Sequence, residues 1–191
     1  MKMKLTIALI VSIPLAAGCG GTRAFLHPEA DLSFYQRVGV IPFLSAGGDQ
    51  TIALAATGNF VTELLIEGGY ELAEPGDFMI RAAKAAGGTD LLRTQPLNAD
   101  QIRALADSTE VQAVFEGMVR NYEMVRVGQG NYPLVSIEVR MIDAETGKLL
   151  WMGSRTRRGG PGVPILGWGE TPTLSELLTK VCSDIAKEVP R

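Results

Sequence analysis

The segment from Leu134 to Asp143 constrains the fold of this chain most, because apolar and polar side chains alternate along nearly all of it. An alternation of period two predicts a β-strand with one buried face and one polar face. The turn Asp143–Lys148 leads into a second strand-like run, Leu149–Thr156. The long segment Ala113–Val127 precedes both and is long enough to require a bulge or bend. The second half of the chain is therefore predicted to form two consecutive antiparallel hairpins.

The first half of the chain alternates strand and helix patterns. Val38–Phe43 is continuously apolar, as in a strand covered on both faces, and Tyr70–Ala73 is a shorter strand. Thr51–Glu67 and Asp77–Ala86 have helical patterns, each followed by a glycine pair. Together the two halves predict an α/β fold: a mixed sheet, parallel in its first half and built of antiparallel hairpins in its second, with helices packed on its faces.

Three helices carry clear local signals. Leu54, Gly58, Val61 and Leu65 form one stripe of the first helix, which is typical of a helix that packs one face on a sheet. Asn98 and Gln101 can form a capping box at the start of another. Thr173 and Glu176 do the same for the last helix, whose apolar positions keep helical spacing to its end. Trp151, on a strand just after a turn, is predicted to be a core residue.

The amino terminus has the form of an export signal. Lys2 and Lys4 precede an apolar run, Leu5–Ala17, that is shorter than the roughly 20 residues needed to cross a bilayer. Cys19 follows Ala-Ala-Gly directly, and this resembles the lipobox of bacterial lipoproteins. The resemblance implies lipidation of Cys19, cleavage before it, and acylation of the new amine, with palmitate as the expected chain. The alternative is an ordinary signal peptide with an incidental cysteine.

The remaining chain is expected to be organised as a tether and one domain. Residues 1–18 are the signal peptide, residues 19–36 the lipidated N-terminus and tether, and residues 37–191 a single periplasmic α/β domain. The whole chain has a net charge of −3, and the domain without Lys2 and Lys4 is more acidic still. Such a charge gives no general attraction to nucleic acid. Membrane attachment is therefore expected through the lipid anchor alone.

Residues that could carry catalysis or hold a cofactor are few. His27, the single histidine, lies in the predicted tether, and no cluster has the spacing of a metal site. Gly47 and Gly48 precede a helix, but the complete phosphate-binding motifs are absent. Cys182 falls on the apolar stripe of the last helix and is predicted to be a buried, inert thiol. The chain is therefore expected to be no enzyme and to use neither cofactor nor metal.

A candidate partner-binding segment spans Arg155–Trp168. It combines a basic cluster with apolar residues in a stretch rich in glycine and proline, and Trp and Arg are enriched at binding hot spots. The alternatives are a solvated strand edge for the arginines and a cover over the domain's own sheet for the apolar residues. The candidate residues are Arg155, Arg157, Arg158, Ile165 and Trp168.

Three short segments together resemble the curli-secretion lipoproteins, the penicillin-binding-protein activator lipoproteins and the amino-terminal domain of the TolB translocation protein. Tyr35–Phe43 resembles their first strand, Gly69–Leu72 their second, and Val139–Trp151 their hairpin ending in tryptophan. The resemblance implies a non-enzymatic domain on the periplasmic side of the outer membrane. Gly20, after the lipidated cysteine, fits sorting to that membrane.

The function expected from these features is that of an outer-membrane-anchored lipoprotein that binds a protein partner in envelope assembly or secretion. The first alternative is a subunit of an oligomeric curli-type secretion ring, which would make the chain a homo-oligomer. The second is a regulator of a peptidoglycan synthase. Two departures weaken those specific roles: Ala113–Asp143 lacks clean lipid-facing strands of the length that a barrel requires, and the tether is short.

Overall fold

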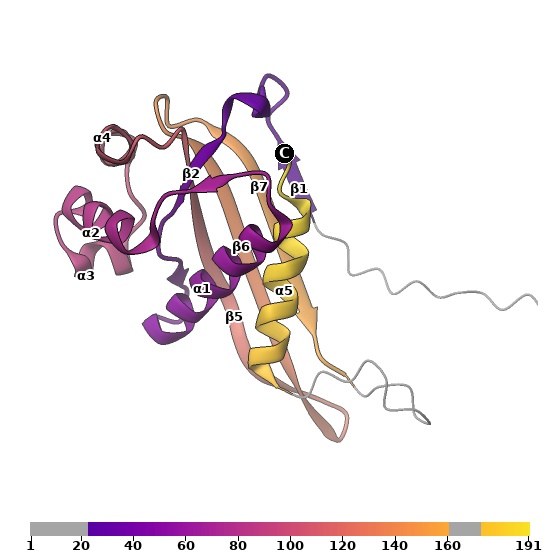
Figure 1. Ribbon diagram of the computed structural model, residues 1–191. Coiled ribbons are helices and arrows are strands. Elements are labelled where there is room, and N and C mark those ends of the chain that lie inside the picture. Colours follow the sequence, from indigo (N-terminus) through magenta and orange to yellow (C-terminus); the bar gives the residue numbers. More distant parts are fainter. Residues whose placement is uncertain (1–22, 161–172) are drawn as a thin grey trace, which may run out of the picture.

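The computed structural model describes residues 23–160 and 173–191, and its described strands form one mixed sheet (Figure 1). The order is β1-β7-β6-β5-β2-β4, with β3 also paired to β5. Pairing is parallel for β2 with β4 and β5 and for β3 with β5, and antiparallel along β5, β6, β7 and β1. The predicted fold class is confirmed. The strands are β1 (Arg23–Leu26), β2 (Arg37–Val40), β3 (Leu44–Ser45), β4 (Glu71–Leu72), β5 (Ala113–Val127), β6 (Gly130–Asp143) and β7 (Leu149–Arg158).

Helices cover the two faces of this sheet unequally. Two long helices lie side by side on one face, called here the α1/α5 face, and three shorter helices gather over one end of the opposite face, the α2–α4 face (Figure 1). The helices are α1 (Gln50–Glu67), α2 (Pro75–Ala86), α3 (Thr89–Thr94), α4 (Ala99–Thr109), α5 (Leu174–Glu188) and a 3-10 turn, η1 (Leu32–Phe34).

The α1/α5 face holds the larger core. Phe60 of α1 packs its ring against Phe43 and Phe115, with ring centroids 5.4 and 5.6 Å apart. Trp151 of β7 is only 1% exposed in the same cluster, so its prediction as a core residue is confirmed. The Phe43 ring lies so close to Gly117 that a Cβ there would approach it to 2.5 Å. Only glycine at this position of β5 leaves room for the ring.

The α2–α4 face holds a second, smaller core. Phe78 of α2 lies on Gly39 of β2, where an added Cβ would approach the ring to 2.1 Å. Val114 and Ile142 supply the sheet side of this core. The predicted capping box of Asn98 and Gln101 begins α4, as both of its hydrogen bonds are formed.

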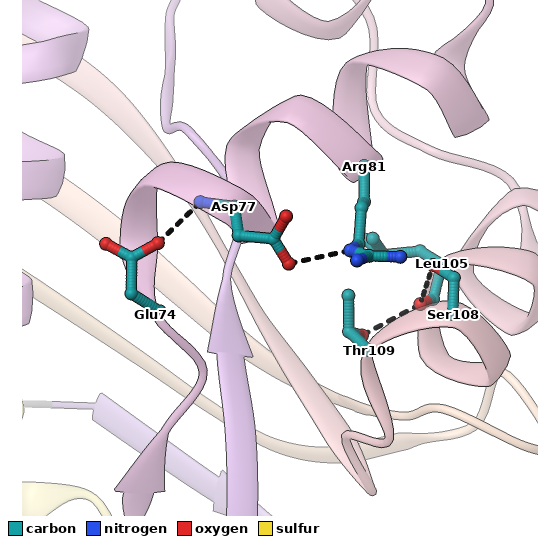
Figure 2. Close-up of polar contacts among 6 residues, drawn as sticks. All are labelled: Glu74, Asp77, Arg81, Leu105, Ser108 and Thr109. Atoms are coloured by element: carbon teal, nitrogen blue, oxygen red, sulfur yellow. Dashed lines mark hydrogen bonds and ion pairs between the residues drawn. The ribbon is translucent and has the colours of Figure 1, made fainter.

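The polar ends of α2 and α4 are satisfied locally (Figure 2). The Glu74 carboxylate accepts a hydrogen bond from the Asp77 amide at the start of α2, and Arg81 pairs with the Asp77 carboxylate at 2.7 Å. At the end of α4, the hydroxyls of Ser108 and Thr109 both donate to the Leu105 carbonyl. These side chains therefore form local contacts within their own helices and helix caps.

Several elements differ from the sequence predictions. β1 and η1 lie within the predicted tether, and the β1 residues pair with Trp151–Ser154 of β7. The short helix α3 was not predicted. β6 begins at Gly130 rather than Leu134, because the pairing between β5 and β6 continues as far as Val127 and Gly130. The bulge expected in Ala113–Val127 is present, between Val119 and Asn121.

The β5–β6 hairpin extends past the rest of the sheet. Arg158, the last residue of β7, pairs with Leu134, and among the described residues no third strand is paired with the hairpin beyond that row. We call Met124–Tyr132 the hairpin tip, and it projects beyond the ends of α1 and α5 (Figure 1). Among the described residues, no helix combines the length and apolarity needed to cross a membrane.

Candidate functional site

The predicted basic cluster on β7 is partly used inside the domain. Arg155 and Arg157 point to the α1/α5 face and both contact the carboxylate of Asp184 on α5. The Arg155 Nε to Asp184 Oδ2 distance is 2.9 Å, and Arg157 Nη2 lies 2.8 Å from Oδ1. Arg158 is exposed at the end of the strand. Two of the three arginines therefore help to hold α5 on the sheet.

The other predicted site residues lie outside the described residues. Cys19, Ile165 and Trp168 are in this group, so the lipidation site and the apolar part of the partner-binding segment stay predictions. The structure describes the two ends that flank residues 161–172, which are the end of β7 and the start of α5.

The outer face of α1 is the surface that sequence reasoning placed wrongly. The stripe Leu54, Gly58, Val61 and Leu65 was expected to pack on the sheet. The structure turns it toward solvent, with Leu54 37% and Leu65 58% exposed. The side chains that pack on the sheet belong to another stripe: Ala53, Ala56, Thr57, Phe60 and Leu64. Small alanines allow the helix close to β5 and α5, and Phe60 then fills the core.

The consequence is a helix that is apolar on both sides. Between Gln50 and Thr62, α1 carries no charged residue, and Ile66, 70% exposed, lies next to Leu65 at the other end. A helix that is hydrophobic all round is normally buried, and a contiguous exposed apolar patch commonly marks an interaction site. We therefore take the outer face of α1 (Leu54, Gly58, Val61, Leu65 and Ile66) as the candidate interaction surface.

A small cavity of about 130 Å³ lies on the α2–α4 face, where the sheet emerges from under the helices. It is lined by the α3–α4 connection around Pro96 and by two ion pairs on the sheet. Arg140 Nη2 lies 3.0 Å from Glu116 Oε2, and Arg120 Nη2 lies 2.8 Å from Glu138 Oε2. The Glu116 side chain is only 9% exposed, and its Oε1 has no hydrogen-bond partner among the residues that the structure describes.

Burial shapes the chemistry of Glu116. Desolvation raises the pKa of its carboxyl group, while the Arg140 charge and a backbone hydrogen bond from Leu97 act in the opposite direction. Sequence reasoning missed this residue, because its position on the polar face of β5 predicts exposure. Only the position of the α3–α4 connection, which covers it, explains the burial.

The described residues offer no catalytic constellation. Cys182 is buried, as predicted, and burial raises the pKa of its thiol to about 12, with a smaller contribution from Glu63, which opposes formation of the reactive thiolate. Tyr35 donates a 2.6 Å hydrogen bond to Asp143, which fixes the start of the domain to the β6–β7 turn. Burial and the Asp143 charge raise the pKa of Tyr35, as expected for a structural hydroxyl. Within residues 23–160 and 173–191, no group of three potential ligands could hold a metal ion.

No protein-family profile matches the sequence, and no curated protein sequence matches it. Solved structures do. PelC from Paraburkholderia phytofirmans, solved as a dodecamer, is similar with a TM-score of 0.57 at 17% identity, over 86% of this chain and 93% of that one. Protein CT253 from Chlamydia trachomatis is similar with a TM-score of 0.52 at 13% identity, over 81% and 95% of the two chains.

A third similar structure is the lipoprotein GNA1162 from Neisseria meningitidis, with a TM-score of 0.48 at 24% identity over 80% of this chain and 99% of that one. Identities this low show a shared fold and nothing finer. Through PelC and CT253, the resemblance stated from the sequence is confirmed at the level of the fold and no further.

Proposed function

We propose that this protein is an outer-membrane lipoprotein, anchored through Cys19, whose periplasmic domain is a non-enzymatic binding factor in envelope assembly or secretion. The observation that carries the proposal is the uncharged outer face of α1. Burying exposed apolar surface is the main favourable term in protein association, at about 25 cal/mol per Å². Leu54, Val61 and Leu65 supply such surface on a rigid helix, whose inner face is fixed in the core by Phe60.

The test is capture of partners from the envelope with the lipidated full-length protein. We expect Leu54→Asp with Leu65→Asp to lose the captured protein, because charges on the stripe cannot be desolvated in an interface. Both residues are exposed, so the melting temperature should stay close to that of the unchanged protein. Ile80→Asp is the matched control, since Ile80 is 71% exposed on α2, away from the stripe. Retained capture by the double variant would remove the stripe as the binding surface.

The anchor is tested separately. Cys19→Ser should abolish labelling with radioactive palmitate and leave the signal peptide uncut by the lipoprotein peptidase. Fractionation of the wild-type envelope should then place the labelled protein with the outer membrane, as Gly20 predicts. Labelling that persists in the variant would exclude Cys19 as the acylated residue.

The second candidate function is that of a subunit of a homo-oligomeric ring. It is favoured by one observation, the fold shared with PelC, which was solved as a dodecamer. Light scattering on the detergent-solubilised protein separates a ring from a monomer. If copies meet through α1, the variant with aspartate at positions 54 and 65 should run as a smaller species, while Ile80→Asp should not. No described feature favours the remaining alternative, regulation of a peptidoglycan synthase.

A further inference from the structure

The distance between the proposed anchor and the first strand is short. Only residues 20–22 separate Cys19 from Arg23, where β1 begins. Four residue steps span at most about 14 Å, even in a fully extended chain. If Cys19 sits at a membrane surface, as the proposed function requires, then Arg23 lies within this distance of that surface.

The strand register fixes the direction in which the anchor leaves the domain. Arg23 pairs with Ser154, and Ser154 pairs with Glu138 of β6. Since β1 is antiparallel to β7, the chain enters β1 from the side toward which β7 ends, which is also the side of the hairpin tip. From Glu138 to Gly130 the strand runs eight residues, or about 27 Å at the usual rise of an antiparallel strand. The hairpin tip therefore extends roughly 13 Å beyond the farthest point that Cys19 can reach in that direction.

The composition of the hairpin tip suits a membrane interface. Met124 is 49% and Val127 40% exposed, and they lie near the end of the hairpin with the half-buried Val125 and Tyr132. Arg126 is the only charged residue from Met124 to Tyr132, in a domain that is acidic overall. Arginine and tyrosine place an apolar body in the lipid while the polar end stays at the headgroups. Arg158, another exposed arginine, lies on the same end of the sheet, where it pairs with Leu134.

We propose that the hairpin tip, Met124–Tyr132, enters the interfacial layer of the membrane that holds Cys19. The proposal rests on lipidation of Cys19 in the proposed function and adds a second membrane contact to it. Two contacts separated along the sheet restrict the rotation of the domain about its anchor. The outer face of α1 is a different surface, and it stays available for a protein partner.

The experiment uses the full-length lipidated protein reconstituted in vesicles of phosphatidylethanolamine and phosphatidylglycerol. A bimane fluorophore is attached to Val127→Cys, and in a second protein to Met124→Cys. The label is selective because Cys19 is acylated and Cys182 is 1% exposed with a raised pKa. Glu145→Cys is the matched control, since Glu145 is exposed in the turn between β6 and β7 at the opposite end of the same strands.

We expect vesicles to shift the emission of both tip labels to the blue, to reduce their quenching by aqueous iodide several-fold, and to allow quenching by nitroxide lipids. The control label should show none of these changes. Tip labels that remain open to iodide on protein that floats with the vesicles would overturn the proposal and leave the anchor intact. Tip labels already shielded without vesicles would also overturn it, because another part of the protein or a second copy would then cover the tip. Protein that neither takes up palmitate nor floats would instead contradict the proposed anchor.

Discussion

The two faces of the sheet are made by the same strands and differ in what their side chains do. On β5 and β6, one set of alternate residues forms the apolar α1/α5 core, including Phe115, Ile137 and Met141. The residues between them point to the α2–α4 face. Under α2 and α4 these residues are apolar, at Val114 and Ile142, and farther along the strands Glu116 and Glu138 form ion pairs with arginines. A single alternating pattern thus supports a stable core on one face and a mixed, partly open surface on the other.

We expect the two faces to differ most in how much stability is lost when a side chain of β7 is truncated. Trp151→Ala removes a ring that is 1% exposed on the α1/α5 face, and we expect it to lower the free energy of unfolding by about 3–5 kcal/mol. Met152→Ala, at the next residue and on the opposite face, should cost clearly less because Met152 is only half-buried. Urea denaturation of both variants measures the difference. Equal costs would show that the two faces contribute alike.

The contact of Arg155 and Arg157 with Asp184, which lies on the α1/α5 face, provides a second test of this comparison. Asp184→Ala leaves Arg155, whose side chain is 14% exposed, without the carboxylate that it contacts. We expect a loss of about 1.5–3 kcal/mol in the free energy of unfolding, the usual contribution of a hydrogen bond to a charged group. Asp107→Ala, at an exposed aspartate of α4, is the control and should change stability by less than about 0.5 kcal/mol. A loss no larger than the control would mean that water replaces the carboxylate.

The buried carboxylate of the α2–α4 face predicts a pH dependence. Because burial raises the pKa of Glu116 in the folded state, the folded protein keeps a proton that the unfolded chain has released. Unfolding then releases a proton, so the stability contributed by this group falls as pH rises from near 4.5, the ordinary value, through the raised folded pKa. Glu116→Gln should therefore gain stability relative to the wild type across that window.

Denaturation curves across a pH series measure this effect. Arg140→Gln is the complementary variant, since it removes the charge that opposes the shift and should extend the loss of stability to higher pH. Parallel pH profiles for the wild type and Glu116→Gln would show that Glu116 ionises alike in the folded and unfolded states.

The smallest expected effect belongs to the open part of the α2–α4 face. Arg120 and Glu138 form an ion pair at 2.8 Å, but the Arg120 side chain is 52% exposed. Exposed pairs contribute up to about 1 kcal/mol, and salt weakens them. A double-mutant cycle of Arg120→Ala and Glu138→Ala should yield a coupling in this range that declines with added salt. A coupling as large as the cost of Asp184→Ala would make this surface as important to stability as the core face.

Elements with a strong internal pattern could be predicted from the sequence, and elements held by long-range contacts could not. The alternation of β6, the capping box of α4 and the apolar spacing of α5 are local, and each is confirmed. All four residues of β1 are exposed, and its strand conformation comes from pairing with β7 more than a hundred residues later. Its four residues contain no pattern that could reveal this.

The outer face of α1 escaped prediction for a different reason. α1 has two apolar stripes, and periodicity alone cannot say which of them faces the sheet. The larger side chains of Leu54 and Leu65 favoured the wrong stripe, whereas close approach to the sheet selects Ala53 and Ala56. The burial of Glu116 was also beyond prediction, since it depends on where the α3–α4 connection lies.

The position of β1 has a mechanical consequence. Any force applied to the chain before Arg23 enters the domain through a four-residue edge strand whose hydrogen bonds all go to β7. A pull along the strand loads those bonds together in shear, whereas a pull away from the sheet breaks them one after another. If β1 detaches, the next contacts to bear the load are those of η1 and the Tyr35–Asp143 hydrogen bond. Detachment would add the residues up to that point to the reach of the chain, about 40 Å when extended, and the large core would stay folded.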